Sequence, residues 1–294
     1  MLGKEWTVVK VPYGGGYCSL NLARPKDAKY APDALQKEFK RQSVFMTDNG
    51  AMIKNAWWNS IDTNSRRCNA SDGWAKINAR LVYNASNLFQ SQKNLLFLGG
   101  SHTITYSTFR AMKNVFGPQT GLIVFDAHPD CCRKADWPVH SDWLRDLIVD
   151  FYLQPENVLI IGLRQIEKSE REFLNEYNIA HWCTNPLRRP DDFSMDNLSV
   201  IWALNKLRKL ETIYLSVDID VVSGVFAPGT GCPSVGGFTD RKLINLVKQI
   251  KNALPNLKAA DIVEINPLNW WQKKILRYDA TVDLGVKLIK EIIS

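Results

Sequence analysis

The chain has 294 residues, of which 45% are hydrophobic, and a formal net charge of +7. This length and composition are typical of a globular protein with a sizeable core, and no stretch approaches the ~18 uninterrupted apolar residues of a membrane helix. The Lys and Arg residues are scattered along the chain. Because nucleic-acid binding is indicated by clustered basic residues, the positive charge does not predict it.

The cysteines and the N-terminus indicate where the protein is found. The six cysteines form no C-x-x-C pair, which predicts reduced thiols and neither a disulfide framework nor a zinc knuckle. The first residues, Met1–Val11, contain no long apolar segment and no small-residue cleavage site. No secretory signal is therefore expected, and a cytoplasmic location is predicted.

Six short runs rich in apolar, β-branched and aromatic residues are predicted to be strands. In chain order they are Thr7–Val11, Leu95–Leu98, Leu122–Phe125, Val158–Ile161, Ile213–Val217 and Ile262–Ile265. Because these runs are apolar on both faces, they indicate parallel strands covered by helices. The Trp-rich stretch from Ala56 to Trp74 has no clear periodicity, and we interpret it as a surface loop or an oligomer contact.

Helical patterns lie between the strands and at the end of the chain. Thr239 is predicted to be an N-cap, and apolar residues follow at helical spacing until Pro255 ends the helix. The segment Thr281–Ile293 is predicted to be a closing helix. Strands alternating with helices predict an α/β fold, a single domain over residues 1–294 with a mainly parallel sheet.

Acidic and histidine side chains occur at the ends of four predicted strands. They are His102, then Asp126, His128 and Asp130, then Asp218 and Asp220, and finally Glu264. Ligands of α/β sheets bind at the carboxyl ends of the strands. Alternate side chains of an extended segment point the same way, so the residues of each Asp-x-His-x-Asp or Asp-x-Asp motif can converge on one point.

The first six of these residues, from His102 to Asp220, predict a metal site. Two imidazoles and four carboxylates exceed what one small ion needs, and the four negative charges would repel strongly without cations. We therefore predict two divalent ions, with Mn²⁺ favoured by the oxygen-rich ligands and Fe, Co, Ni or Zn as alternatives. Such a pair, typically ~3.5–4 Å apart, supplies hydroxide at neutral pH. The predicted reaction is hydrolysis at an electrophilic carbon.

The motifs around these residues resemble those of the arginase/agmatinase (ureohydrolase) family. The matching segments are Gly99-Gly100-Ser101-His102, Asp126-Ala127-His128-Pro129-Asp130, Ser216-Val217-Asp218-Ile219-Asp220, Pro228-Gly229-Thr230-Gly231-Cys232-Pro233 and Glu264-Ile265-Asn266-Pro267. The resemblance implies a three-layer arginase/deacetylase-like sandwich with a parallel sheet of about eight strands. It also implies two Mn²⁺ ions per subunit, a trimer or hexamer, and a role in arginine or polyamine metabolism.

The resemblance further implies hydrolysis of a guanidino C–N bond with release of urea, by attack of the metal-bridging hydroxide on the guanidinium carbon. Glu264 matches the glutamate that pairs with the substrate guanidinium, and His140 matches the proposed proton shuttle to the leaving amine. Asp130 is counted with them among the catalytic residues. Glu167 matches an acidic residue near the substrate amino group, with Glu170 at a second acidic position. His181 matches no family role and is predicted to be structural.

The chain departs from the family pattern most in the segment from Cys131 to Val139. Arginases hold the substrate carboxylate there with Asn and Ser in a longer loop, whereas Cys132 and Arg133 are the candidate substrate contacts here. The difference favours agmatine, which lacks the carboxylate, over arginine. Smaller departures are Ser101 for Asp, Ser141 for Gly, Cys232 for Thr and Ser223-Gly224 for Asp-Pro.

Other functions remain open from the sequence. Arg133 or Lys134 would suit a guanidino acid or formiminoglutamate if either faced the substrate. Zinc-dependent deacetylation occurs on a similar fold, but it normally uses one ion and fewer acidic ligands. A non-catalytic family member that binds metal or a partner is the remaining alternative, supported by Ser101 and the altered loop.

Overall fold

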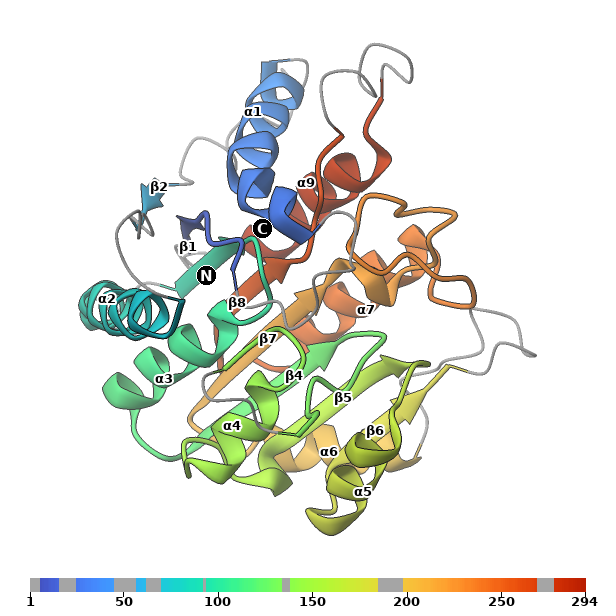
Figure 1. Ribbon diagram of the computed structural model, residues 1–294. Helices are drawn as coiled ribbons and strands as arrows, with labels where there is room; N and C mark the ends of the chain where they lie inside the picture. The colour runs from blue at the N-terminus through green and yellow to red at the C-terminus, as the bar shows by residue number, and fades with distance from the viewer. Residues whose placement is uncertain are drawn as a thin grey trace.

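The computed structural model describes residues 6–15, 25–44, 57–61, 70–91, 94–133, 138–184, 198–268 and 278–294. These residues form one sheet with helices on both faces (Figure 1). The elements in chain order are β1 (Trp6–Val11), η1 (Pro25–Tyr30), α1 (Ala31–Val44), β2 (Trp57–Ser60), α2 (Ala70–Gln90), β3 (Asn94–Gly99), α3 (Ile104–Phe116), β4 (Thr120–Phe125), α4 (Trp143–Val149), η3 (Pro155–Asn157), β5 (Val158–Leu163), α5 (Lys168–Glu176), β6 (Ala180–Cys183), α6 (Leu198–Leu207), β7 (Thr212–Asp218), η4 (Ile219–Val221), α7 (Asp240–Ala253), β8 (Leu257–Val263) and α9 (Ala280–Ile293).

The sheet has eight strands in the order β2-β1-β3-β8-β7-β4-β5-β6. All pairings between these strands are parallel. The predicted α/β fold with a mainly parallel sheet is therefore confirmed. Because parallel strands end at the same edge of the sheet, β3, β8, β7 and β4 bring their carboxyl ends together at its centre.

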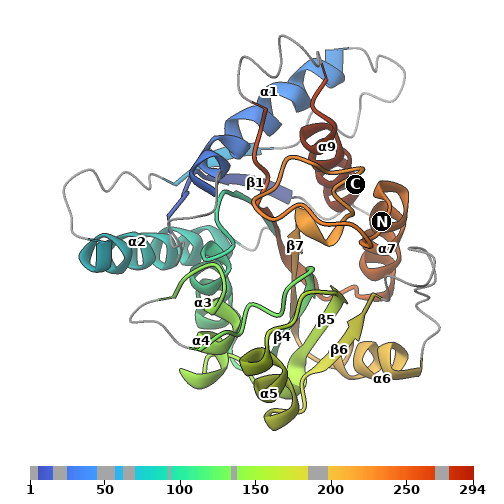
Figure 2. The ribbon, with the colours of Figure 1, turned by 45° about the vertical axis from the view of Figure 1, so that its right-hand side comes forward.

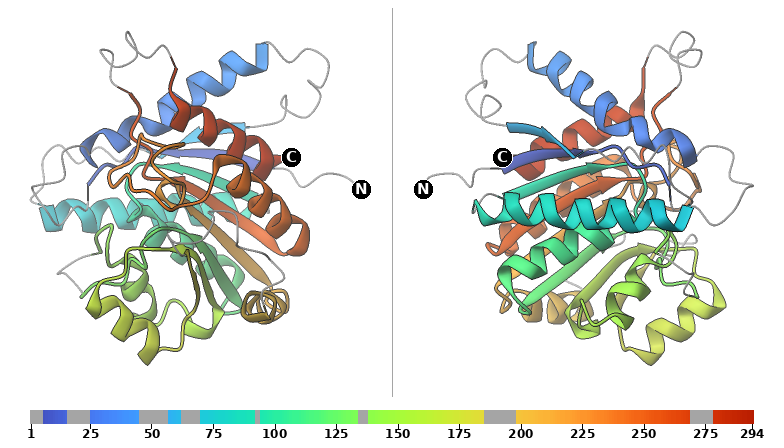
Figure 3. Two further views of the ribbon diagram at one scale, coloured as in Figure 1. Left: turned by 90° about the vertical axis from the view of Figure 1, so that its right-hand side faces the viewer. Right: turned by 60° about the vertical axis from the view of Figure 1, so that its left-hand side comes forward.

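Each face of the sheet contributes to its own hydrophobic core. In β3, Leu96 and Leu98 belong to one core, whereas Leu95 and Phe97 belong to the other, as the two-residue repeat of a strand requires. In Figure 2 the helices α2, α3 and α4 lie on one side of the sheet, and α6, α7 and α9 lie on the other. The right-hand view of Figure 3 shows α2 and α3 crossing in front of the sheet. No helix of the described ranges has the length and apolar character needed to span a membrane.

The interpretation of the Trp-rich stretch as a surface loop is wrong for its described residues. Trp57–Ser60 is the edge strand β2, which pairs with β1, and Trp74 lies in α2 and is only 4% exposed. The ring of Trp74 packs 5.3 Å from that of Tyr13. Tertiary packing, and not local periodicity, thus determines the structure here. Positions 56 and 62–69 lie outside the described residues.

The end of the last strand also differs from the prediction. The structure ends β8 at Val263, so Glu264 follows the strand, and its φ of 61° is unusual for a residue other than glycine. The short strand β6 was not predicted, and His181 lies within it, exposed, with Nδ1 donating to the Ile179 carbonyl at 2.8 Å. The two predicted helices are confirmed as α7, which Thr239 caps, and α9.

Candidate active site

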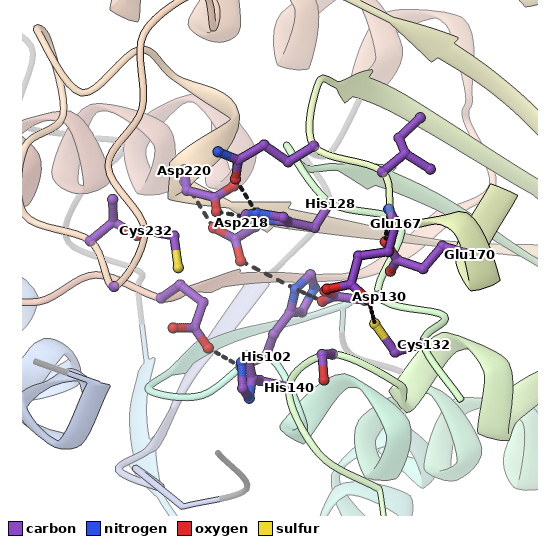
Figure 4. A pocket seen from close by; sticks show the side chains of 16 residues that line it. His102, His128, Asp130, Cys132, His140, Glu167, Glu170, Asp218, Asp220 and Cys232 are labelled. Atoms are coloured by element: carbon purple, nitrogen blue, oxygen red, sulfur yellow. Dashed lines mark hydrogen bonds and ion pairs between the residues drawn. The ribbon is translucent and has the colours of Figure 1, made fainter. Parts of the chain in front are cut away.

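The carboxyl ends of the four central strands surround a cavity of about 500 Å³. Nine predicted site residues line it, and Figure 4 shows eight of them labelled: His102, His128, Asp130, Cys132, His140, Glu167, Asp218 and Asp220, with Glu264 as the ninth. Asp126 is fully buried beside His102 and His128. Arg133 is exposed and is not among the lining residues.

The first half of the candidate site centres on His102. Its Nδ1 atom lies 3.1 Å from Asp126 Oδ2, 2.9 Å from Asp130 Oδ2 and 3.3 Å from Asp218 Oδ2. The imidazole and the Asp218 carboxylate are 1% and 5% exposed. Three carboxylates therefore converge on one ring nitrogen in a place that water barely reaches.

The other ring nitrogen of His102 is held by a buried network. Nε2 lies 2.9 Å from Ser216 Oγ, and that hydroxyl donates to Asp261 Oδ1 at 2.7 Å. Asp261 also accepts from Thr105 and Tyr214, at 2.7 and 2.8 Å, and burial raises its pKa. Because the Ser216 hydroxyl donates its proton to Asp261, the Ser216 oxygen accepts a hydrogen bond from the His102 Nε2–H. This arrangement leaves the Nδ1 lone pair directed at the carboxylates, as a metal ligand requires.

The second half centres on His128. Its Nδ1 lies 3.0 Å from Asp220 Oδ2 and 3.6 Å from Asp126 Oδ1. Its Nε2 is hydrogen-bonded to the side-chain oxygen of Gln165. The imidazole is 26% exposed, so this half is open to the cavity and is supported by a neutral amide.

The donor set fits divalent cations. Two groups of potential ligands share Asp126: His102, Asp126 and Asp218 form one, and Asp126, His128 and Asp220 form the other. The buried atoms His102 Nδ1 and Asp126 Oδ2 lie 3.1 Å apart, but in the described structure neither has a partner with the geometry of a hydrogen bond. Buried polar atoms are normally paired, and a cation between them would satisfy both.

The crowding of carboxylates also explains the pKa shifts of the proposed ligands. Burial opposes a charge on His102 and His128, but the surrounding carboxylates outweigh it and raise the pKa of both rings. Burial also raises the pKa of Asp218, and the charges of Asp220 and Asp126 add to this effect. The cluster therefore holds excess protons in the absence of ions, as expected where too many negative charges share a small volume.

Glu264 lines the cavity on the side of β8. Its Oε1 accepts from the backbone N–H of His102 at 2.7 Å, and its own N–H donates to the Gly100 carbonyl at 2.8 Å. Thr230, on the loop bridged to Ile265, also lines the cavity, and its buried Oγ1 makes no hydrogen bond in the described structure. A fixed carboxylate and a hydroxyl thus face the cavity from the side of β8.

The cavity also has an acidic wall at the start of α5. Glu170 is 3% exposed, and it accepts from the backbone N–H groups of Cys131 and Glu167 at 3.3 and 2.9 Å. Burial raises the pKa of Glu170. The Cys132 Sγ lies 3.9 Å from Glu167 Oε2. No Lys or Arg is found among the described residues that line the cavity.

Several residues of the site were not singled out from the sequence. Ser216 and Thr230 lie inside motifs that were recognised in the sequence, so their closeness to the proposed ligands could have been predicted. Asp261 is a lone acid within an apolar strand, which indicates a buried polar contact. Gln165 and Trp143, whose Nε1 donates to Asp130 Oδ2 at 2.7 Å, carry no local signal.

Together the parallel sheet and the paired His–carboxylate groups define an α/β protein with a candidate divalent-metal site at its carboxyl edge. Residues 5–294 match the family model described as "Arginase family". The chain belongs to this family, as the resemblance of its motifs indicated, and membership implies a divalent metal at these groups.

Named relatives agree with this assignment. The chain is 29% identical to an arginase of Plasmodium berghei over 215 residues and to an agmatinase of Citrobacter koseri over 192 residues, and these matches cover 66% and 65% of this chain. The chain spans 58% of the length of each of these two relatives. Among solved structures, formimidoylglutamase from Bacillus subtilis has the same fold, with a TM-score of 0.79 and 21% identity over 99% of this chain and 86% of that one.

Proposed function

We propose that this chain is a binuclear-metal ureohydrolase, one catalytic domain over residues 1–294, that hydrolyses a guanidino C–N bond and releases urea. The observation that carries the proposal is the pair of His–Asp groups that share Asp126. The same cavity contains Glu264 and His140, the residues that such a reaction needs to bind a guanidinium and to move a proton.

The proposed ligands are His102, Asp126, His128, Asp130, Asp218 and Asp220. Asp130 is included because its Oδ2 lies 2.9 Å from His102 Nδ1. We propose two Mn²⁺ ions, since carboxylate oxygens outnumber imidazoles in both groups. When bound, two such ions lower the pKa of water enough to supply a hydroxide nucleophile at neutral pH.

The remaining groups bind the substrate and transfer its proton. The Glu264 carboxylate suits a planar, permanently charged guanidinium, and the contact from the His102 N–H fixes its orientation. His140 lines the cavity and is proposed to deliver a proton to the leaving amine, because imidazole titrates in the useful range. Asp130, which both lines the cavity and adjoins His102, is the proposed ligand nearest to the reacting atoms.

The acidic wall favours a substrate that carries a second positive charge. Glu167 and Glu170 line the cavity together with Cys132, so a substrate amine finds carboxylates there, whereas a substrate carboxylate finds no lysine or arginine among the described lining residues. Agmatine is therefore proposed ahead of arginine. The predicted contact through Arg133, which would suit formiminoglutamate, gains no support from its exposed position outside the lining. The alternative contact, Lys134, lies outside the described residues.

The test is an assay of the Mn²⁺-loaded protein for urea release from agmatine, arginine and guanidinobutyrate, and for formamide release from formiminoglutamate. We expect the highest kcat/KM with agmatine. Formamide release as the main activity would replace the proposed reaction with that of the rival substrate. A protein that binds two ions and turns over none of the four would contradict the catalytic proposal.

The family resemblance also supports a cytoplasmic homo-oligomer, a trimer or hexamer. The described cysteines Cys131, Cys132, Cys183 and Cys232 are free thiols, as expected in a reducing compartment. Analytical ultracentrifugation of the Mn²⁺-loaded protein measures the oligomeric state, and a monomer would contradict this part of the proposal.

A further inference from the structure

Trp143 lies behind the His102 half of the candidate metal centre. It is the first residue of α4 and is fully buried. Its indole Nε1–H donates to Asp130 Oδ2 at 2.7 Å, and its ring centroid lies 4.6 Å from that of His102. One side chain therefore contacts two of the proposed ligands.

The backbone around Trp143 holds Asp130 from the other side. The amide of Leu144 donates to the Asp130 carbonyl at 3.1 Å. Asp130 has a φ of 49°, a left-handed conformation that is costly for most residues and that Asp tolerates better than most. Because the start of α4 binds both the carbonyl and the carboxylate of Asp130, it fixes where this carboxylate points.

The contact is more specific than a buried indole requires. A buried indole N–H needs some acceptor, but here the acceptor is the same Oδ2 atom that lies 2.9 Å from His102 Nδ1. The hydrogen bond thus occupies one lone pair of that oxygen and leaves the carboxylate facing His102. The packing of the indole against the His102 ring limits the rotation of the second ligand as well.

We propose that Trp143 is a positioning residue of the metal centre, which orients Asp130 through its indole N–H and His102 through its ring. The inference rests on the proposed function, because it requires ions at these ligands. Groups that orient metal ligands typically contribute about 10- to 100-fold in metal affinity. Since the indole touches the ligands directly, its fluorescence also reports when the His102 half is filled.

The test compares Trp143→Phe and Trp143→Leu, which both remove the N–H donor, with Trp143→His, which returns a ring N–H. Trp202→Phe is the matched control, because Trp202 is 65% exposed on α6. Cooperative melting of the metal-free protein identifies the variants that fold. Mn²⁺ content is then measured at graded free Mn²⁺ concentrations, together with tryptophan fluorescence.

We expect Phe or Leu at position 143 to weaken the binding of one of the two ions by about 10- to 100-fold and to leave the other unchanged, with partial recovery in the His variant. The fluorescence change on Mn²⁺ addition should persist in Trp202→Phe and be lost in the position-143 variants. A lower melting temperature with unchanged Mn²⁺ affinity would reduce Trp143 to a packing residue and overturn the inference. A wild-type protein that binds no divalent ion would overturn the proposed function itself.

Discussion

The two halves of the candidate metal centre differ in what supports their histidines. His102 is 1% exposed, and its Nε2 is held by Ser216 and, through it, by the buried carboxylate of Asp261. His128 is 26% exposed, and its Nε2 contacts only the neutral side chain of Gln165 among the described residues. A charged partner behind a ligand raises its basicity and fixes its orientation. For the two ions proposed here, the comparison predicts tight binding beside His102 and weaker, more accessible binding beside His128.

The ligand that both halves share gives the largest expected effect. The two oxygens of Asp126 face different histidines, so Asp126→Asn removes charge from both halves at once. We expect both ions to be lost at Mn²⁺ concentrations that saturate the wild type, with a fall in kcat/KM of more than about 100-fold. Metal analysis after gel filtration measures the content. Asp33→Asn, at a side chain that is 74% exposed, is the control and should retain both ions.

The buried support of His102 should matter next. Ser216→Ala removes the hydroxyl that accepts from His102 Nε2–H and donates to Asp261. Both groups therefore lose a hydrogen bond. We expect binding of the His102 ion to weaken by about 10- to 100-fold, with the other ion less affected. Isothermal titration with Mn²⁺ measures the two affinities, and equal weakening of both would contradict the separation into halves.

The neutral Gln165 behind His128 allows a substitution that strengthens metal binding. Gln165→Glu places a carboxylate behind the imidazole, so we expect the weaker ion to bind about tenfold more tightly. Gln165→Leu should weaken the same ion. Gln154→Glu adds the same charge at an exposed position on another loop, and it should change neither affinity. A Gln165→Glu variant that bound its ions like the wild type would remove Gln165 from this account.

The smallest effect is expected at the acidic wall formed by Glu167 and Glu170, near the open His128 half. Glu167 is exposed and lines the cavity, so Glu167→Gln should raise the KM for agmatine about 5- to 10-fold with little change in kcat, as for a contact made equally before and during the reaction. Steady-state urea release measures both constants. Glu172→Gln, on the same helix with a side chain that is 62% exposed, is the control. An unchanged KM would exclude Glu167 as a contact.

The sequence singled out the proposed metal ligands but not the residues that support them. The proposed ligands follow strand ends, and the parallel sheet brings those ends together. The expected extended geometry is wrong in detail, because Asp220 lies in η4 and Asp130 has a φ of 49°. Ser216 and Asp261 act from neighbouring strands, β7 and β8, and their contact depends on the register of that pair. Register between strands is determined by tertiary packing, which a single sequence does not reveal.

The fold was predicted to a similar degree. Strands that are apolar on both faces, such as β4, were recognised, whereas β2 was hidden in a Trp-rich stretch. The strand β8 was recognised only at its end, because the buried Asp261 and the alanines before it hid its first part. The substrate loop was the least predictable part. Arg133 follows the ligand motif closely in sequence but lies outside the cavity lining, while Gln165, from another strand end, lines it.

The most direct test of the two unequal halves is the Mn²⁺ content of the wild-type protein after dialysis against buffers of decreasing free Mn²⁺. The account predicts loss in two steps, with a plateau at one ion per chain. It also predicts that Gln165→Leu shifts only the first step and Ser216→Ala only the second. Loss of both ions in a single step, or a shift of the same step by both variants, would contradict it.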